Sequence, residues 1–276
     1  MKKILTIQDI SCMGQCSLTV ALPIISAFGI ETAVIPTAVL STHTAFNGFT
    51  FHDLTEELPQ IQEHWEHEQI RFDGFYTGYI GSIQQIQYIK NMMNRLANPK
   101  AVKVVDPCMA DHGKLYAGFS NDFPKYMLEL CKEADVIVPN LTELCLLLDV
   151  PYQEYKKEEL EELVKKMSDK IEASVVLTGV SFEADKLGSL TYNRDKNELT
   201  YFFTRRVPVF FHGTGDCFAS AFFGAVMKGY DYAKASEIAC WFTYLAIANT
   251  ESDAKEHWYG VHFEKALGYI TNLEAK

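Results

Sequence analysis

The sequence predicts an α/β protein with a mainly parallel central sheet and helices on both faces. Short runs rich in β-branched and aromatic residues alternate with helical patterns over most of the chain, which is typical of parallel strands joined by helices. With 276 residues, 48% of them hydrophobic, the chain can build one large α/β unit. No repeat, linker or low-complexity stretch divides it, so we expect a single domain over residues 1–276.

Each expected element follows from a local pattern. Short apolar runs predict strands over residues 3–7, 32–40, 74–79, 102–105, 136–138 and 175–177. Two more strands, 189–193 and 199–205, flank the polar turn 194–198 and predict a hairpin. Helical periodicity predicts helices over 18–28, 54–65, 82–96, 122–132, 141–148, 154–171, 218–228, 233–249 and 263–273. Gly29 ends the first of these helices, and Ser82 is placed to cap the third.

Charge and cysteine content exclude several classes of protein. A net charge of −11 argues against a surface for nucleic acid or anionic membranes. No apolar run approaches the roughly 20 residues of a membrane span, and the apolar part of the N-terminus is too short for a signal peptide. The 7 cysteines include no Cys-x-x-Cys pair, which argues against a disulfide framework or a zinc site. Reduced thiols indicate a cytoplasmic protein.

A glycine-flanked turn near the C-terminus carries the clearest chemistry. Gly213 and Gly215 allow a tight turn, and an apolar helix follows at once. The free N–H groups at the start of such a helix bind anions. Asp216 lies beside this anion site, where a carboxylate can take a proton from an attacking hydroxyl. The alternative is an ordinary loop in which Asp216 only caps the helix.

Polar residues also follow the other predicted strands. In a mainly parallel sheet the carboxyl ends of the strands share one edge, where ligands bind. Six such clusters are therefore expected beside the anion turn, and capping alone does not explain them all. They are Gln8 to Ser11, Ser41 to Thr44, Thr77 to Tyr79, Asp106 with Asp111, Asn140 to Glu143, and Thr178 with Gly179.

On these residues the chain resembles the pyridoxal kinases of the ribokinase-like superfamily over essentially its whole length. It is most similar to bacterial pyridoxamine kinases that begin with Asp-x-Ser-x-x-Gly-x-Cys-Ser, which here spans Asp9 to Ser17. A β-sheet lid near the N-terminus is missing, as in pyridoxal kinases and unlike sugar kinases. The resemblance implies a ribokinase-like kinase with no separate lid domain, which phosphorylates a B6 vitamer at its 5′-hydroxymethyl group in the salvage of pyridoxal 5′-phosphate.

The resemblance also implies a role for each matching position. Asp216 would be the base, and Gly213, Thr214 and Gly215 the anion hole. The vitamer pocket would comprise Asp9, Ser11, Thr42, His43 and Tyr79. ATP phosphates and Mg²⁺ would meet Asp106, Asn140 and Glu143, while Asp111 and Thr178 would serve a monovalent cation (K⁺ or Na⁺) or phosphate. The adenine slot would be lined by Val207, Val209 and Phe211. A homodimer with small-molecule substrates, and with neither nucleic acid nor a membrane as partner, is expected.

Two positions depart from the family pattern, and other functions remain open. Asp9 stands where many pyridoxal kinases have Ser, and Val138 where relatives often have Thr, so vitamer preference and the cation site are left undecided. The first alternative is a hydroxymethylpyrimidine kinase, but that family typically has Cys at the position of Asp216. The second is a non-catalytic vitamer carrier, which would not need a base.

Overall fold

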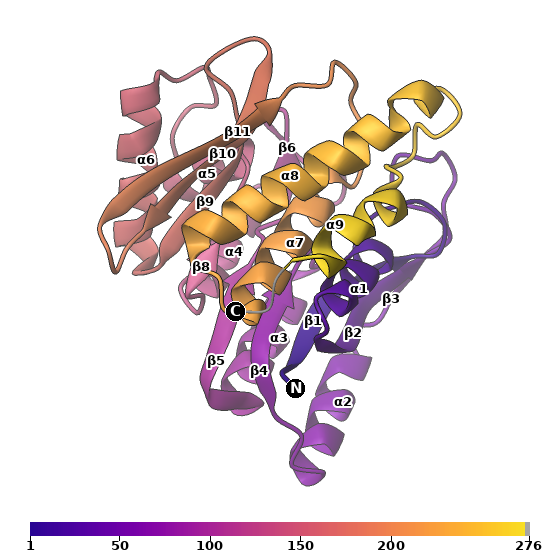
Figure 1. Ribbon diagram of the computed structural model, residues 1–276. Helices are drawn as coiled ribbons and strands as arrows, with labels where there is room; N and C mark the ends of the chain where they lie inside the picture. The colour runs from indigo at the N-terminus through magenta and orange to yellow at the C-terminus, as the bar shows by residue number, and fades with distance from the viewer. Residues whose placement is uncertain (274–276) are drawn as a thin grey trace.

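The structure, a computed structural model, describes residues 1–273. The last three residues of the domain expected over 1–276 lie outside this part. A nine-stranded sheet runs through the molecule in the order β11-β10-β9-β8-β5-β4-β1-β2-β3 (Figure 1). Its strands are β1 (Lys3–Ser11), β2 (Glu31–Leu40), β3 (Phe51–Asp53), β4 (Phe72–Thr77), β5 (Ala97–Val105), β8 (Val136–Ile137), β9 (Ser174–Val180), β10 (Lys186–Asn193) and β11 (Glu198–Arg205).

The centre of this sheet is parallel, as the sequence predicts. The pairs β1·β2, β1·β4, β4·β5, β5·β8 and β8·β9 are parallel. Antiparallel pairing is confined to the two sides, where β3 joins β2 and the hairpin β10·β11 joins β9. The carboxyl ends of β1, β4, β5 and β8 therefore lie along one edge, which is where ligands bind in such sheets.

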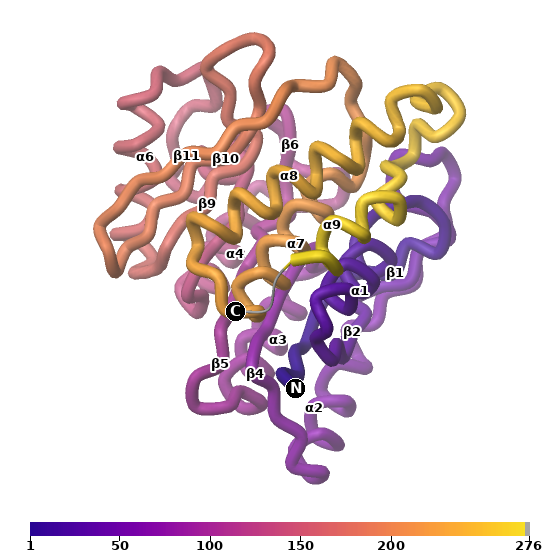
Figure 2. Tube along the Cα trace, viewed as in Figure 1, coloured from indigo at the N-terminus to yellow at the C-terminus, as the bar shows by residue number. Residues whose placement is uncertain are grey.

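Helices cover both faces of the sheet (Figure 1). One face carries α2 (Glu57–His67), α3 (Ile83–Arg95), α4 (Phe123–Cys131), α5 (Leu141–Leu148) and α6 (Lys157–Ile171). The other carries α1 (Leu18–Ala27), α7 (Thr214–Lys228), α8 (Tyr232–Thr250) and α9 (Leu267–Thr271). Figure 2 shows α9 beside α1, so the end of the chain packs against its beginning.

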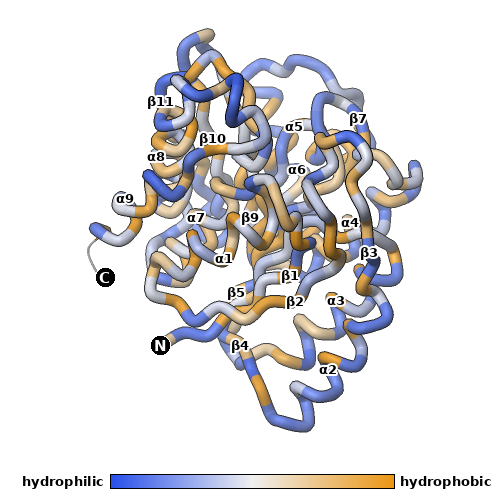
Figure 3. The backbone as a smooth tube through the Cα atoms, turned by 90° about the vertical axis from the view of Figure 1, so that its right-hand side faces the viewer, coloured by the Kyte–Doolittle hydropathy of each residue, from blue (hydrophilic) through white to orange (hydrophobic). Residues whose placement is uncertain are grey.

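Each face of the sheet has its own hydrophobic core, because successive side chains of a strand point to opposite sides. Val105 belongs to the core under α2–α6, whereas its neighbour Val104 belongs to the core under α1 and α7–α9. Figure 3 shows the same division along the chain: hydrophobic stretches gather in the interior, and hydrophilic ones on the outer surfaces. No helix of the described residues is both long and apolar enough to cross a membrane.

Differences from the predicted elements occur at their ends and in the short pieces. Strand β1 continues to Ser11 and β5 begins at Ala97, both beyond the apolar runs that predicted them. Helix α7 begins at Thr214 rather than at residue 218, because the anion turn supplies its first turn. The expected helix 263–273 divides into the 3₁₀ helix η2 (Phe263–Ala266) and α9, and the 3₁₀ helix η1 (Glu251–Asp253) follows α8. Strand β3 and the small hairpin β6 (Ala110–Asp111) and β7 (Lys114–Leu115) were not predicted.

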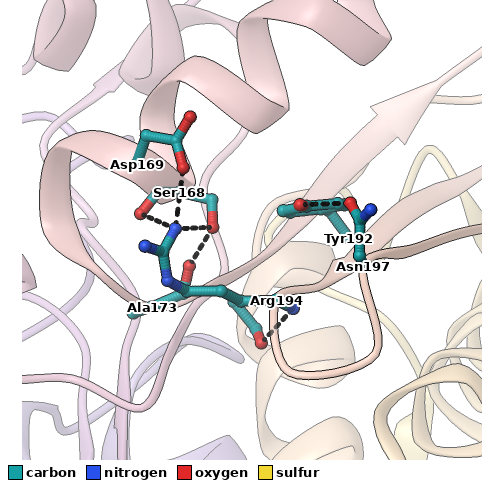
Figure 4. A network of polar contacts seen from close by, with 7 residues as sticks. Ser168, Asp169, Ala173, Tyr192, Arg194 and Asn197 are labelled. Atoms are coloured by element: carbon teal, nitrogen blue, oxygen red, sulfur yellow. Dashed lines mark hydrogen bonds and ion pairs between the residues drawn. The ribbon is translucent and has the colours of Figure 1, made fainter.

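A polar network fastens the β10–β11 hairpin to α6 (Figure 4). The Arg194 guanidinium donates to the carbonyl oxygen of Ser168 at 3.2 Å and to Asp169 Oδ1 at 2.8 Å. The Arg194 backbone N–H donates to Ser174 Oγ at 3.1 Å, and Ser168 Oγ donates to the carbonyl oxygen of Ala173 at 2.6 Å. These residues lie at the amino-terminal edge of β9, opposite the edge where the parallel strands end.

Candidate active site

Asp216 is the third residue of α7 and the centre of the candidate site. Protein atoms surround its carboxyl group, and this burial raises the pKa of Asp216 to about 7. The backbone N–H of Ser17 partly opposes the shift, and the charge of Asp9 adds to it. The residue nevertheless keeps some exposed surface, so a ligand can reach it. A carboxyl group that titrates near neutral pH can act as a general base.

The two glycines that precede Asp216 lie in different surroundings. Gly213 has φ 77°, and an added Cβ would lie 1.8 Å from the carbonyl oxygen of Gln15, so the turn preceding α1 packs directly against it. Gly215 has an ordinary backbone, and an added Cβ would meet no heavy atom within 4 Å. Open space at the start of α7, beside free N–H groups, suits an approaching phosphoryl group. The structure brings Gly213, Thr214, Gly215 and Asp216 together at this point.

Asp106 lies immediately after β5 and is buried. Burial raises the pKa of its carboxyl group well above the usual range, and the charges of Glu143 and Asp216 raise it further. Asp106 therefore interacts with two other carboxyl groups, that of the predicted base Asp216 and that of Glu143 at the start of α5. Three carboxyl groups sharing one buried region favour a ligand that brings positive charge.

Glu143 and Asn140 form a capping box at the start of α5. Asn140 Oδ1 accepts from the Glu143 N–H at 3.0 Å, and Glu143 Oε2 accepts from the Asn140 N–H at 2.9 Å. Glu143 Oε1 accepts from the Met109 N–H at 3.1 Å. Burial still raises the pKa of Glu143 to about 7, despite these opposing hydrogen bonds. Each carboxylate oxygen of Glu143 therefore accepts a hydrogen bond from the backbone, which joins the start of α5 to the loop after β5.

The three predicted metal ligands do not gather as a set. Among residues 1–273, no group of three or more His, Cys, Asp or Glu side chains could hold a metal ion. Asp111 lies in the β6–β7 hairpin, where its carboxylate is 3.6 Å from His112 Nε2 and accepts from the His112 N–H. A buried Asp106 oxygen remains a suitable donor for Mg²⁺, because this ion commonly takes one or two carboxylates and completes its shell with water and phosphates.

The predicted vitamer pocket lies at the ends of β1 and β4. Ser11 Oγ donates to Asp9 Oδ2 at 3.1 Å, and both side chains are buried. Burial raises the pKa of Asp9, while the hydroxyls of Ser17 and Ser11 oppose the shift. Tyr79 stands against Phe119 with ring centroids 5.5 Å apart, and burial, followed by the charge of Asp9, raises the pKa of Tyr79 to about 12. These contacts gather Asp9, Ser11 and Tyr79 in one region.

Thr42 and His43 occupy the loop after β2. The Thr42 hydroxyl is buried and has no hydrogen-bond partner, which suits it to a ligand. His43 is fully engaged instead: Nδ1 accepts from the Ala45 N–H at 3.2 Å, so Nε2 carries the proton and donates to the carbonyl oxygen of Tyr259 at 2.8 Å. Burial lowers the pKa of His43. Both ring nitrogens of His43 are therefore occupied, and the ring lies among those of Phe46, His212 and Trp258.

The predicted adenine slot is the least assembled part of the site. Val207 and Val209 are partly exposed, but Phe211 is buried in the core under α7 and α8. The neighbouring Phe210 is 63% exposed and lies against the rings of His112 and His212. Just before the start of α5, the carbonyl oxygen of Pro139 accepts from the Thr178 hydroxyl at 3.3 Å.

Several residues of the site were not singled out from the sequence. Ser17 reaches both Asp9 and Asp216. Gln15 touches Gly213, and its backbone and side chain hydrogen-bond to Tyr259 and Glu264 near the C-terminus. The motif from Asp9 to Ser17 could have pointed to Ser17 and Gln15. No local pattern could have indicated the contact with Tyr259, more than 200 residues away.

Comparison with known proteins places this geometry in a family. The sequence profile described as phosphomethylpyrimidine kinase matches residues 22–260. The chain belongs to this family of kinases. A pyridoxal kinase from Arabidopsis thaliana is 25% identical over 93% of this chain and 85% of its own length. A pyridoxal kinase from Histophilus somni is 27% identical over 95% of this chain and 92% of its own length.

Solved structures agree with the family assignment. A Bacteroides thetaiotaomicron protein that carries the phosphomethylpyrimidine kinase name, crystallised with pyridoxal, has a TM-score of 0.93 and 38% identity, covering 100% of this chain and 97% of its own. A pyridoxal kinase from Lactobacillus plantarum has a TM-score of 0.89 and 33% identity, covering 98% and 96%. The ribokinase-like α/β fold expected from the sequence is therefore confirmed, and the chain is similar to pyridoxal kinases throughout.

Proposed function

We propose that this kinase transfers the γ-phosphoryl group of ATP to the 5′-hydroxymethyl group of a vitamin B6 vitamer, within the salvage of pyridoxal 5′-phosphate. The observation that carries the proposal is Asp216, a carboxyl group with a pKa raised to about 7 at the open start of α7. The similarity to pyridoxal kinases, and to a pyridoxal-bound structure at 38% identity, supports the choice of substrate. The chain would work as one kinase domain.

In the proposed reaction Asp216 removes the proton of the vitamer hydroxyl as its oxygen attacks the γ-phosphorus. The bond between this phosphorus and the bridging oxygen of ATP breaks, so ADP leaves and the proton stays on Asp216. The N–H groups at Gly213, Thr214 and Gly215 face the transferring group, where they stabilise its charge. Asp9, Ser11, Thr42 and Tyr79 hold the vitamer, with the His43 ring as part of the wall.

On the nucleotide side we assign Asp106 to the phosphates and Mg²⁺, with Asn140 and Glu143 shaping the loop that carries them. The donor set fits a magnesium ion that is held mainly by phosphate and water. When bound, Mg²⁺ would neutralise charge on the phosphates. Asp111 and Thr178 remain candidates for a monovalent cation or phosphate, and Val207, Val209 and Phe210 for the surroundings of adenine. The buried position of Phe211 suits it to supporting this wall from behind.

A coupled ADP-release assay over pyridoxal, pyridoxamine, pyridoxine and hydroxymethylpyrimidine tests the proposal. We expect turnover of at least one vitamer with ATP and Mg²⁺. Hydroxymethylpyrimidine is the second candidate substrate, because the matching family is described as phosphomethylpyrimidine kinase. Turnover of hydroxymethylpyrimidine while every vitamer fails would overturn the proposal in its favour, and binding of vitamers without any ADP release would indicate a carrier.

The cellular compartment and the oligomeric state of the enzyme are also part of the proposal. All seven cysteines are free thiols in the structure, which supports a reducing compartment such as the cytoplasm. Similarity to pyridoxal kinases supports a homodimer, which sedimentation equilibrium would test. The acidic surface offers no support for nucleic acid or a membrane as partner.

A further inference from the structure

Ser17 has a backbone conformation that side-chain-bearing residues rarely adopt. Its φ is 56° and its ψ is −132°, in a region that is almost confined to glycine. The residue is buried, and its backbone forms an isolated antiparallel bridge with Ile10, which lies between Asp9 and Ser11. Strain of this kind persists only where the surrounding structure enforces it, and it gathers at functional sites.

The hydroxyl of Ser17 is not used for the role that its position predicts. Ser17 is the N-cap residue of α1, and serine is among the best N-caps, yet its side chain makes no capping hydrogen bond. Its carbonyl oxygen still accepts from the N–H groups of Val20 and Ala21, so the helix begins normally. The hydroxyl is turned instead toward the Asp9 carboxylate.

The turn that contains Ser17 also lies directly against the start of α7. Gly213 leaves no room for a side chain beside the Gln15 carbonyl oxygen, and an added Cβ there would lie 3.6 Å from Cys16 Sγ. This packing brings the Ser17 N–H to the Asp216 carboxylate. The backbone of Ser17 thus lies beside the proposed base, and its hydroxyl lies beside the pocket carboxylate.

We propose that Ser17 is a positioning residue, which fixes the Asp9 carboxylate relative to Asp216 so that substrate and base meet in reacting geometry. The kinetic part of this inference rests on the proposed function. Glycine would relieve the backbone strain, so the hydroxyl serves the site rather than stability: without it, the buried Asp9 carboxylate would have Ser11 as its remaining side-chain donor.

Two substitutions separate the hydroxyl from the strain. Ser17→Gly removes both, and Ser17→Ala removes the hydroxyl but keeps the strain. Both should lower kcat/KM for the vitamer by about tenfold, the cost of one lost hydrogen bond to a buried carboxylate, with the KM for ATP unchanged. Ser17→Gly should melt at or above the wild-type temperature, so its kinetic loss would not follow stability.

Thr19→Val is the matched control, because Thr19 supports the same turn without reaching either carboxylate. Its hydroxyl donates to the carbonyl oxygen of Cys16 at 2.8 Å. This variant should melt at a lower temperature and keep the wild-type kcat/KM. Equal kinetic loss in Thr19→Val and Ser17→Gly would make Ser17 a purely structural part of the turn and overturn the inference.

The titration of the Asp9 carboxyl carbon, followed by ¹³C NMR, gives a measurement that does not depend on turnover. Loss of the Ser17 hydroxyl should move the pKa of Asp9 upward, because that hydroxyl favours the charged form, while Thr19→Val should leave it unchanged. The titratable groups that the charge of Asp9 affects are Asp216 on α7, Tyr79, Cys16 and Cys108, and all are intact in these variants.

These measurements distinguish the two proposals. A wild-type protein that phosphorylates no vitamer would end the proposed function, and the Asp9 titration would still decide the role of Ser17. An active enzyme whose Ser17→Gly variant keeps wild-type kcat/KM and Asp9 titration would overturn the Ser17 inference alone.

Discussion

The two edges of the central sheet use similar polar residues in opposite ways. At the edge where the parallel strands end, Asp9 and Asp106 are buried and Asp216 is half-buried near them, and each has a raised pKa. At the other edge, Arg194 is paired with a carboxylate, a carbonyl oxygen and a hydroxyl, as Figure 4 shows. The first arrangement places like charges together, and the second satisfies each charge locally.

This difference separates stability from function. Buried carboxyl groups with raised pKa values disfavour the folded state once they ionise, so the first edge is retained at a thermodynamic cost. A ligand that carries a cation can compensate the charge of these carboxylates. A ligand that forms hydrogen bonds can pair with the Thr42 hydroxyl, which is buried and has no partner. The Arg194 network holds the hairpin on α6 through hydrogen bonds to Ser168 and Asp169.

The largest expected effect is the loss of turnover in Asp216→Asn. Gly213 is the N-cap of α7 and Asp216 is the third residue of the helix, so Asp216 does not cap it. Asn has nearly the same size as Asp, so a purely structural role predicts little change. A base role predicts a fall in kcat of about 10²–10⁴-fold, with vitamer and nucleotide binding largely kept. The coupled ADP-release assay and equilibrium binding measure the two. A variant that retains most of its turnover would rule out the base assignment.

The same variant should be more stable than the wild type at alkaline pH. Because folding raises the pKa of Asp216 from 3.8 to about 7, the carboxyl group favours the folded state less and less as pH rises through this window. Removing the charge should therefore raise the free energy of unfolding at pH 8 by on the order of a few kcal/mol, with a smaller gain as pH falls toward 4. Denaturant unfolding at both pH values checks this sign; a loss of stability at pH 8 would contradict it.

Gly215 and Gly213 give a second test within the first edge. Gly215→Ala meets open space in the structure and should fold normally, yet it should lower kcat/KM for ATP by about tenfold or more, because the added methyl group occupies the approach to the anion site. Gly213→Ala is the matched control, since the clash with Gln15 should lower the melting temperature itself. If Gly215→Ala had normal ATP kinetics, the proposal that the phosphoryl group binds at the start of α7 would be wrong.

A smaller effect is expected on the pH profile. Since Asp216 must be ionised to act, kcat/KM should rise with pH through about 7. The charge of Asp9 contributes to that value, so Asp9→Asn should move the acid limb to lower pH by up to about one unit, besides weakening vitamer binding. Measurement of kcat/KM between pH 5 and 9 tests the coupling, and an acid limb that stays in place would show that the two carboxyl groups act independently.

The sequence predicted the order of the elements because hydrophobic periodicity is local. It also predicted that Asp9, Asp106 and Asp216 share one edge, because parallel strands must end together. The engagement of His43 with Tyr259 and the packing of Gln15 against Gly213 depend on contacts between distant segments, and local patterns carry no signal for them. The Asn140 to Glu143 spacing, in contrast, is a local pattern: the structure shows a capping box through Glu143 Oε2, while Oε1 accepts from the Met109 N–H.

The smallest expected effect comes from the second edge and isolates stability. Arg194→Ala removes hydrogen bonds to Ser168 and Asp169 at the end of the sheet remote from Asp216. We expect a loss of about 1–2 kcal/mol, seen as a melting temperature lower by roughly 2–8 °C, with kcat and both KM values unchanged. Asp169→Asn is the matched control: its side chain is 75% exposed, so loss of this ion pair should cost under about 1 kcal/mol. If Arg194→Ala altered vitamer or ATP kinetics while Asp169→Asn did not, the two edges would be coupled through β9 and β10, and the separation of stability from function would fail.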